Sequence, residues 1–215
     1  MDIQEYIYQN QKIQSYLLDF IEKYNNYDNC FELLIKCINN NKITQNRVEF
    51  KLFLLLIYDI ANNHHRNQMF FPKLEKIWLT FKDQIKQYFS NTEIFELFKR
   101  NKVMILFFIQ NEIINLDKTI ANLIYEQRDR RLTLYYTFYF YPEIKPFLDE
   151  NDQLTLQSKI ETLGPDVLDD FEEKRNNGVN DSYLCKLIRE DSVIEFIKYV
   201  NKTNLPLSSK ITSSI

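Results

Sequence analysis

The most informative stretch of this sequence covers residues 180–215 and reads NDSYLCKLIREDSVIEFIKYVNKTNLPLSSKITSSI. Its first part carries apolar residues spaced three and four positions apart, namely Leu184, Leu187 and Ile188. This spacing predicts one apolar face of a helix, and Asn180 or Asp181 can cap the start of that helix. A helix of this kind needs a partner that covers its apolar face.

A second helix is expected directly afterwards. Ser192 and Glu195 have the S-x-x-E spacing of a capping box, in which both side chains bind otherwise unpaired N–H groups at a helix start. The apolar face of this second helix would consist of Val193, Ile194, Ile197 and Val200. Each helix spans about three turns, which is too short for stability alone in water. We therefore expect the two helices to pack against each other and against neighbours.

The segment CKLIREDSVIEFIKYVN, residues 185–201, resembles the helix–turn–helix of an ankyrin repeat. In that repeat a Gly-Asp type turn joins the two helices, and the second helix carries V-x-x-L-L-like positions. Glu190 stands where the turn glycine is usual and the T-P-L-H opening is absent, which suits an atypical terminal repeat. Together with FYPEIKPFL, residues 140–148, the stretch is similar to a large protist family in which a helical N-terminal region of unknown function precedes ankyrin repeats.

The resemblance implies a non-enzymatic module that binds a protein partner. Ankyrin arrays bind through their turns and first helices, so the residues expected nearest a partner-facing edge are Asn180, Asp181, Ser182, Tyr183 and Lys186. Residues 205–215 would be the loop toward a second repeat. Either the natural product is longer, or the array is truncated and the second helix exposes Ile197 and Val200.

Glycine is almost missing, with 2 residues against 17 Phe and 14 Tyr. Because glycine supplies the positive-φ turns of sandwiches and barrels, its scarcity favours helices joined by Asn-rich turns. A hydrophobic content of 45% with 27% charged residues is typical of a globular chain. We predict an all-α protein with a helical domain over residues 1–175, either a bundle or a solenoid of helical hairpins. Residues 176–178 would link it to an ankyrin-like unit over residues 180–215.

Apolar periodicity and capping signals place the helices of the first domain. We expect helices over residues 3–24, 28–38, 44–60, 72–89, 90–98, 103–116, 120–125, 134–141, 152–163 and 167–174. Specific signals are Thr44 as a cap, Pro72 at a first helical position, and a capping box of Ser90 and Glu93. The aromatic run at 134–141 could form a strand, but an unpaired strand would leave its backbone groups unsatisfied, so a helix is expected.

No pattern in the sequence indicates an enzyme, a cofactor or a metal site. Nucleophile elbows and phosphate-binding loops need glycines at fixed positions, and neither Gly164 nor Gly178 lies in such a frame. The adjacent His64 and His65 lack the further ligands that a metal ion requires, so we interpret them as part of an exposed loop. We therefore expect no catalytic residue, no cofactor and no metal.

A net charge of −3 and a pI near 5.6 argue against broad attraction to nucleic acid or anionic lipid. One basic–aromatic cluster leaves an alternative open, because Arg128–Arg131 lies beside Tyr135, Tyr136 and Tyr139, and Arg and Tyr stack on single-stranded bases. RNA or single-stranded DNA binding is thus the lesser alternative, against a helix surface above an aromatic core. A self-contained helical adaptor without an ankyrin relation is the other alternative.

The cysteines and the apolar runs bear on the compartment. Three cysteines without an apolar N-terminal signal indicate a reducing compartment, so we expect a cytoplasmic, or else nuclear, protein. Cys30 and Cys37 are expected to be buried small apolar residues, since no basic neighbour in register would lower a thiol pKa. The longest apolar runs, Leu52–Tyr58 and Val103–Ile109, are far shorter than the ~20 residues that a bilayer span needs, so no membrane association is expected.

Overall fold

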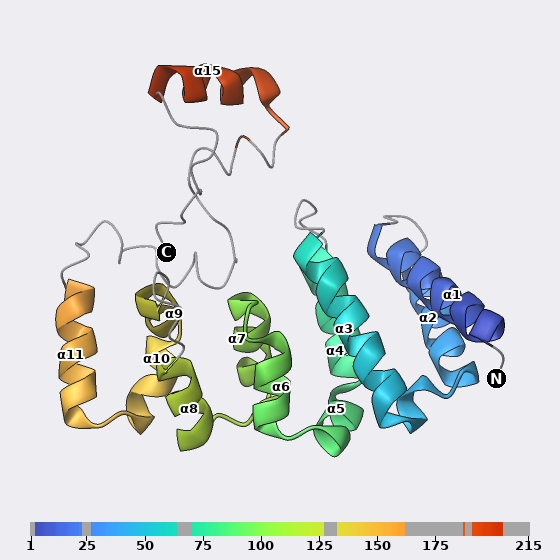
Figure 1. Cartoon of the computed structure of the whole chain (residues 1–215), viewed down its shortest axis with the longest axis horizontal. Helices are drawn as coiled ribbons and strands as arrows, with labels where there is room; N and C mark the ends of the chain where they lie inside the picture. The colour runs from blue at the N-terminus through green and yellow to red at the C-terminus, as the bar shows by residue number, and fades with distance from the viewer. Residues whose placement is uncertain are drawn as a thin grey trace. The chain divides into compact units, whose positions relative to one another are not determined.

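The computed structural model describes residues 3–22, 27–63, 70–126, 133–161, 187 and 191–203. Every regular element in these ranges is helical, which confirms the all-α prediction (Figure 1). The elements are α1 (Ile3–Glu22), α2 (Tyr27–Asn40), η1 (Ile43–Gln45), α3 (Arg47–Asn63), α4 (Phe70–Thr80), α5 (Lys82–Tyr88), α6 (Asn91–Phe98), α7 (Lys102–Gln110), α8 (Lys118–Tyr125), α9 (Thr133–Tyr139), α10 (Tyr141–Ile144), η2 (Lys145–Phe147), α11 (Glu150–Glu161) and α15 (Val193–Thr203).

The chain divides into two compact units, and the division falls inside α7. The first unit comprises Met1–Asn101 and Phe107–Ile114, and the second comprises Lys102–Leu106 and Asn115–Ile215. One continuous helix therefore contributes side chains to both units. The linker expected at residues 176–178 and the helix expected at 167–174 lie outside the described residues.

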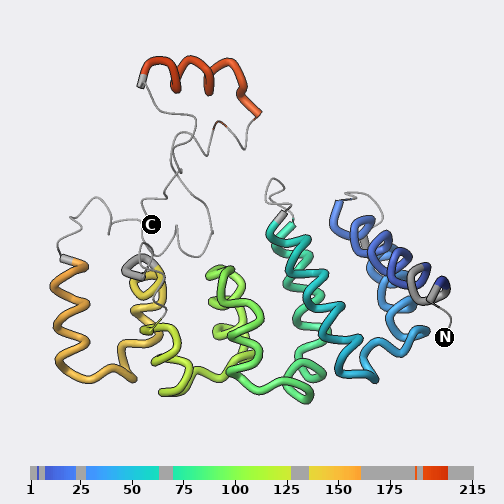
Figure 2. The backbone as a smooth tube through the Cα atoms, in the orientation of Figure 1, coloured from blue at the N-terminus to red at the C-terminus, as the bar shows by residue number. Residues whose placement is uncertain are grey.

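In the first unit, helices that follow one another in the chain lie beside one another (Figure 2). α1 packs along α2 to form a helical hairpin, and α1 also contacts α4. α3 packs on η1 and on α4. Packing between helices that are close in the sequence is typical of helical hairpins joined by short loops.

Aromatic rings fill the core of the first unit. Trp78 of α4, Phe98 of α6 and Phe108 of α7 meet edge to face, with ring centroids 5.1–5.3 Å apart. These three side chains are at most 1% exposed. Edge-to-face aromatic pairs contribute about 0.5–1.5 kcal/mol each beyond the burial of their area. The triangle thus fixes three helices against one another.

The single helix expected at 72–89 is wrong, because the structure has two helices that meet at Phe81. α4 begins at Phe70, two residues before Pro72, and α5 follows from Lys82. Phe81 has φ −105° and ψ 13°, and its ring packs 5.9 Å from that of Phe50 and 5.7 Å from that of Phe53. Burying this ring against α3 explains the bend, which the continuous apolar spacing did not reveal.

The capping signals had mixed outcomes. The capping box of Ser90 and Glu93 is confirmed at the start of α6. The cap assigned to Thr44 is wrong, since Asn46 Oδ1 accepts the N–H groups of the residues that begin α3, at 2.8 and 3.3 Å. Arg47 then bonds Glu93 and donates from Nε to the Tyr88 carbonyl at 3.0 Å, which ties α3 to α5 and α6.

The helix expected at 103–116 is too long, because α7 ends at Gln110. Glu112 adopts φ 55°, and the N–H of Ile113 donates to the carbonyl of Phe108 at 2.8 Å. This is a Schellman motif, which usually needs glycine at the left-handed position. The motif turns Ile113 and Ile114 into the core, where each is at most 1% exposed.

A buried lysine joins α4 to α1. Lys73 is 3% exposed, and its Nζ donates to the carbonyl oxygen of Ile21 at 2.7 Å. That carbonyl belongs to the last turn of α1, where carbonyl groups lack partners within the helix. Burial lowers the pKa of Lys73, and a smaller effect of Cys30 raises it. The ammonium group therefore supplies a hydrogen-bond donor to a carbonyl group at the end of α1. In that position it loses much of its own hydration.

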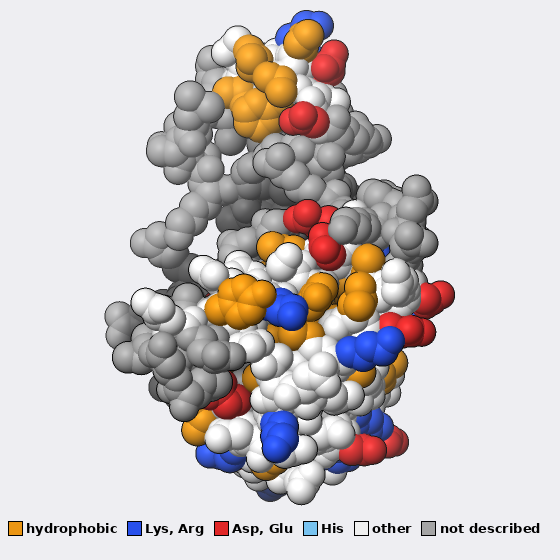
Figure 3. Space-filling view, turned by 90° about the vertical axis from the view of Figure 1, so that its right-hand side faces the viewer, with side chains coloured by type: hydrophobic (Ala, Val, Ile, Leu, Met, Phe, Trp, Pro, Cys, Tyr) orange, Lys and Arg blue, Asp and Glu red, His pale blue; other side chains and the backbone are white. Residues whose placement is uncertain are grey.

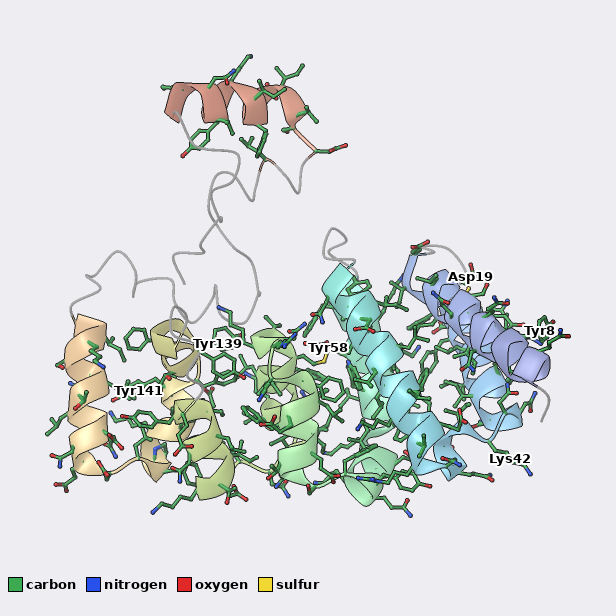
Figure 4. The ribbon with its side chains drawn as sticks, in the orientation of Figure 1. Tyr8, Asp19, Lys42, Tyr58, Tyr139 and Tyr141 are labelled. Atoms are coloured by element: carbon green, nitrogen blue, oxygen red, sulfur yellow. The ribbon has the colours of Figure 1, made fainter. Side chains whose placement is uncertain are left out.

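In the second unit, the aromatic run at 134–141 is helical, as predicted, and forms α9 and the start of α10. Tyr139, labelled in Figure 4, is 2% exposed, and Lys102 Nζ lies 4.7 Å from the centre of its ring. The helix expected from residue 152 begins at Glu150, with the Asp149 carboxylate accepting the N–H of Asp152 at 2.8 Å.

A hydrogen bond between Tyr125 and Asp152 joins α8 to α11. The Tyr125 hydroxyl donates to Asp152 Oδ1 at 2.7 Å. This bond, followed by burial and the negative charges of Asp152 and Asp149, raises the pKa of Tyr125 to about 12. Ionising the phenol would remove the donated proton and place two negative charges together.

The contact between Lys73 and Ile21 predicts that substituting Lys73 destabilises the protein more than substituting Lys76, another lysine of α4. Lys73→Met should lower the free energy of unfolding by about 2 kcal/mol, because the Ile21 carbonyl loses its buried donor. Lys76→Met is the matched control, since Lys76 pairs with an Asp28 side chain that is 84% exposed and exposed pairs contribute about 0–1 kcal/mol. Urea unfolding followed by circular dichroism measures both. Equal losses in the two variants would contradict this role of Lys73.

The raised pKa of Tyr125 predicts an alkaline change in stability. The folded state holds the phenol proton more tightly than the unfolded state, whose tyrosines titrate near their ordinary value of about 10. This stabilisation is fully present below pH 10 and is lost as the pH rises toward about 12. Tyr125→Phe should lower the free energy of unfolding by about 1 kcal/mol at pH 8. The difference from wild type should shrink between pH 10 and 12.

The control for this prediction is Asp152→Asn, which keeps a neutral acceptor and removes the charge. Its Tyr125 should titrate closer to 10 in an absorbance titration at alkaline pH. A Tyr125→Phe variant whose deficit stayed constant from pH 8 to about pH 12 would contradict the linkage.

Candidate functional site

The candidate site is α15 (red in Figure 1) with the turn that precedes it. The N–H of Ser192 donates to the carbonyl of Leu187 at 2.9 Å, which is the six-residue bond of a Schellman motif. Asp191 holds the left-handed position of this turn with φ 50°. Aspartate tolerates this conformation better than most residues because its short side chain can bond locally.

The apolar residues of α15 differ in exposure. Three aliphatic side chains are largely exposed, with fractions of 57% for Val193, 64% for Ile194 and 52% for Ile197. Phe196 and Val200 are half-buried. Figure 3 shows apolar side chains gathered on the surface of this helix. We call Val193, Ile194 and Ile197 the aliphatic face of α15.

The exposure of Ile197 agrees with the expectation for an unstacked repeat, whereas Val200 is only half-exposed. Fully burying a Val or Ile side chain is worth about 1.5–3 kcal/mol. Three such exposed residues on one short helix therefore form a surface whose burial against another apolar surface is favourable. Contiguous exposed apolar residues with a polar border are typical of protein contacts.

The residues that sequence analysis assigned to the partner-facing edge lie outside the described residues. They are Asn180, Asp181, Ser182, Tyr183 and Lys186. In the same segment the structure describes Leu187, which is 4% exposed and contacts the start of α15 through the bond to Ser192. The described part of the site is therefore the second helix of the expected pair.

The basic–aromatic cluster is described only in part, because Arg128–Arg131 lies outside the described residues. Tyr139 is buried beside Phe140, and the ring of Tyr136 packs 5.0 Å from the ring of Phe140. Both tyrosines therefore take part in the packing of the second unit.

The other chemical groups also act in packing. Cys30 and Cys37 are buried free thiols, as predicted, and burial raises the pKa of Cys37. His64 and His65 lie outside the described residues. Within the ranges that the structure describes, no group of three or more His, Cys, Asp or Glu side chains could hold a metal ion. Within the same ranges, no helix has the length and apolar character of a membrane span.

Comparison with known proteins does not add a family. No protein-family model, no curated protein and no solved structure matches this chain.

Sequence analysis did not foresee the buried polar contacts of the two units. Lys73, Lys102 and the Tyr125–Asp152 pair join helices that are far apart in the sequence. No spacing rule reveals them, because each depends on how helices pack in three dimensions. These contacts stabilise the packing of the helices that they join.

Proposed function

We propose that the protein is a non-enzymatic protein-interaction module, and that its C-terminal helix pair, of ankyrin type, binds a protein partner through α15. The observation that carries the proposal is the aliphatic face of α15, where three adjacent β-branched side chains are 52–64% exposed. A soluble chain gains from covering such a surface with apolar side chains of a partner.

The turn before α15 supports the ankyrin-type assignment. The left-handed conformation of Asp191 and the hydrogen bond from the Ser192 N–H to the Leu187 carbonyl form a tight turn directly before α15. The half-buried Phe196 lies about 100° from Ile197 around the helix and extends the apolar surface of α15 to a second side. A helix with two apolar sides suits a repeat, in which each unit packs on the units before and after it.

The acidic total of the chain and the packed tyrosines favour a protein partner over nucleic acid. The alternative function is a self-contained helical adaptor, which would also bind a protein partner but whose helix pair would be unrelated to ankyrin repeats. Because both functions depend on binding a protein, one capture experiment tests both.

Substituting one residue of the aliphatic face should abolish partner capture. We expect Ile197→Glu to lower the recovery of at least one co-purifying protein by tenfold or more, which corresponds to about 1.4 kcal/mol of binding free energy. Burying an unpaired carboxylate in an apolar contact costs at least that much. The measurement is quantitative mass spectrometry of proteins captured by tagged wild-type and variant chains from the source cells.

Leu154→Glu is the matched control, because Leu154 is a similarly exposed aliphatic residue, 67% exposed, on a different helix, α11. This variant should capture the same proteins as wild type. If every captured protein were recovered equally with wild type and Ile197→Glu, α15 would not be the binding surface.

A further inference from the structure

A carboxylate without a partner among the described residues lies between apolar side chains on α4, in the first unit. Phe71, Glu75 and Leu79 are spaced four residues apart, so they follow one another along one side of the helix at intervals of about 6 Å. Leu79 is 46% exposed, whereas Phe71 and Glu75 are half-buried. Pro72 is exposed and lies about 20° around the helix from Leu79. We call these four residues the α4 surface.

One side of the α4 surface is held in place by α7. The ring of Phe71 packs 6.1 Å from the ring of Phe107, at an interplanar angle of 82°. Trp78, on the same side of α4, packs on Phe108 of α7. Glu75 lies about 40° from Phe71 around the helix, toward the exposed Leu79. Its carboxylate thus lies between a fixed aromatic ring and an exposed aliphatic side chain.

The described part of the chain does not supply a cation for Glu75. No hydrogen bond or ion pair joins its side chain to another described group. The two nearest lysines in the sequence have other contacts. Lys73 Nζ donates to the Ile21 carbonyl at 2.7 Å, and Lys76 Nζ pairs with Asp28 at 3.1 Å. Burial raises the pKa of the Glu75 carboxyl above its ordinary value.

This arrangement is unfavourable in the isolated chain and favourable in a complex. A charged group that loses hydration without gaining a counterion costs free energy, and a cation from another molecule would remove that cost. The apolar neighbours would gain from burial against the same molecule. Among cations, an arginine suits the position best, because its guanidinium forms two parallel hydrogen bonds with a carboxylate and packs flat on an aromatic ring.

We propose that the α4 surface is an interaction site for a protein segment that places an arginine on Glu75 and apolar side chains on Phe71 and Leu79. The site goes beyond the proposed function of α15. The α4 surface belongs to the first unit and α15 to the second, so each site would bind a partner of its own.

Selection of short random peptides displayed on phage tests the proposal. The full wild-type chain is the immobilised target, and clones that also bind the Glu75→Gln chain are removed by counter-selection. The retained peptides should share an arginine with a Leu, Met or aromatic residue within about four positions. In fluorescence anisotropy with a synthetic copy of the most enriched peptide, Glu75→Gln should raise the Kd tenfold or more, because the bound arginine loses its counterion.

Two matched controls lie on α2. Glu32→Gln removes the same charge from a side chain that is 67% exposed, and should leave the Kd of the peptide within about twofold of wild type. Leu79→Ala should raise the Kd by about threefold or more, because an apolar contact of the peptide is lost. Leu33→Ala should not raise it, although Leu33 is 38% exposed.

A charge swap separates a direct contact from a damaged fold. Glu75→Lys should lose the selected peptide but should bind the same peptide with its arginine replaced by glutamate. A chain that had merely lost its structure would bind neither peptide. The urea midpoint of Glu75→Gln at pH 7 should equal or exceed that of wild type, since the substitution removes a charge that burial disfavours. A lower midpoint would contradict the absence of an internal partner for Glu75.

The remaining outcomes decide between the two sites. Ile197→Glu should bind the selected peptide as wild type does, because Ile197 belongs to α15. A selection that yields no peptide dependent on Glu75, or a peptide whose Kd for Glu75→Gln stays within about twofold of wild type, would overturn the α4 site. Either result would leave the proposed function of α15 unaffected, because that function is tested by protein capture with Ile197→Glu.

Discussion

Most helices of this protein are short, and a short amphipathic helix is stable only when other elements cover its apolar side. In the first unit, aromatic rings provide this cover. Trp78, Phe98 and Phe108 lock α4, α6 and α7 together, and Phe50 packs on Phe81 where α4 gives way to α5. The same requirement applies to α15, whose aliphatic face is largely exposed. That difference leads to the interpretation of α15 as a binding helix.

The scarcity of glycine constrains how these helices are connected. In the described ranges, positive φ occurs at three non-glycine residues, Lys42, Glu112 and Asp191, and the first two lie just beyond α2 and α7. At Glu112 and Asp191 a six-residue hydrogen bond closes the turn. The left-handed conformation costs a residue with a β-carbon about 1–2 kcal/mol. The contacts that these turns make possible, such as the burial of Ile113 and Ile114, offset that cost.

The all-α class and most helix positions could be predicted, because apolar spacing and the shortage of glycine are properties of the sequence itself. The capping box at Ser90 could be predicted because both of its partners lie within four residues. The break at Phe81 and the end of α7 at Gln110 could not, since each depends on rings or isoleucines that pack across the fold. For the site, the pattern identified α15 and the exposure of Ile197. The structure has a residue with positive φ, Asp191, directly before α15, in the region where the pattern predicted a turn.

The claim on which the functional account depends is that the aliphatic face of α15 is open to solvent in the isolated chain. Methyl relaxation enhancement by a soluble gadolinium chelate, recorded at low protein concentration, measures this directly. The account predicts that the methyl groups of Ile194 and Ile197 relax several-fold faster than those of the buried Ile77 and Ile85. Enhancements as small as those of Ile77 would show that the chain itself covers α15, and would contradict a binding role for this face.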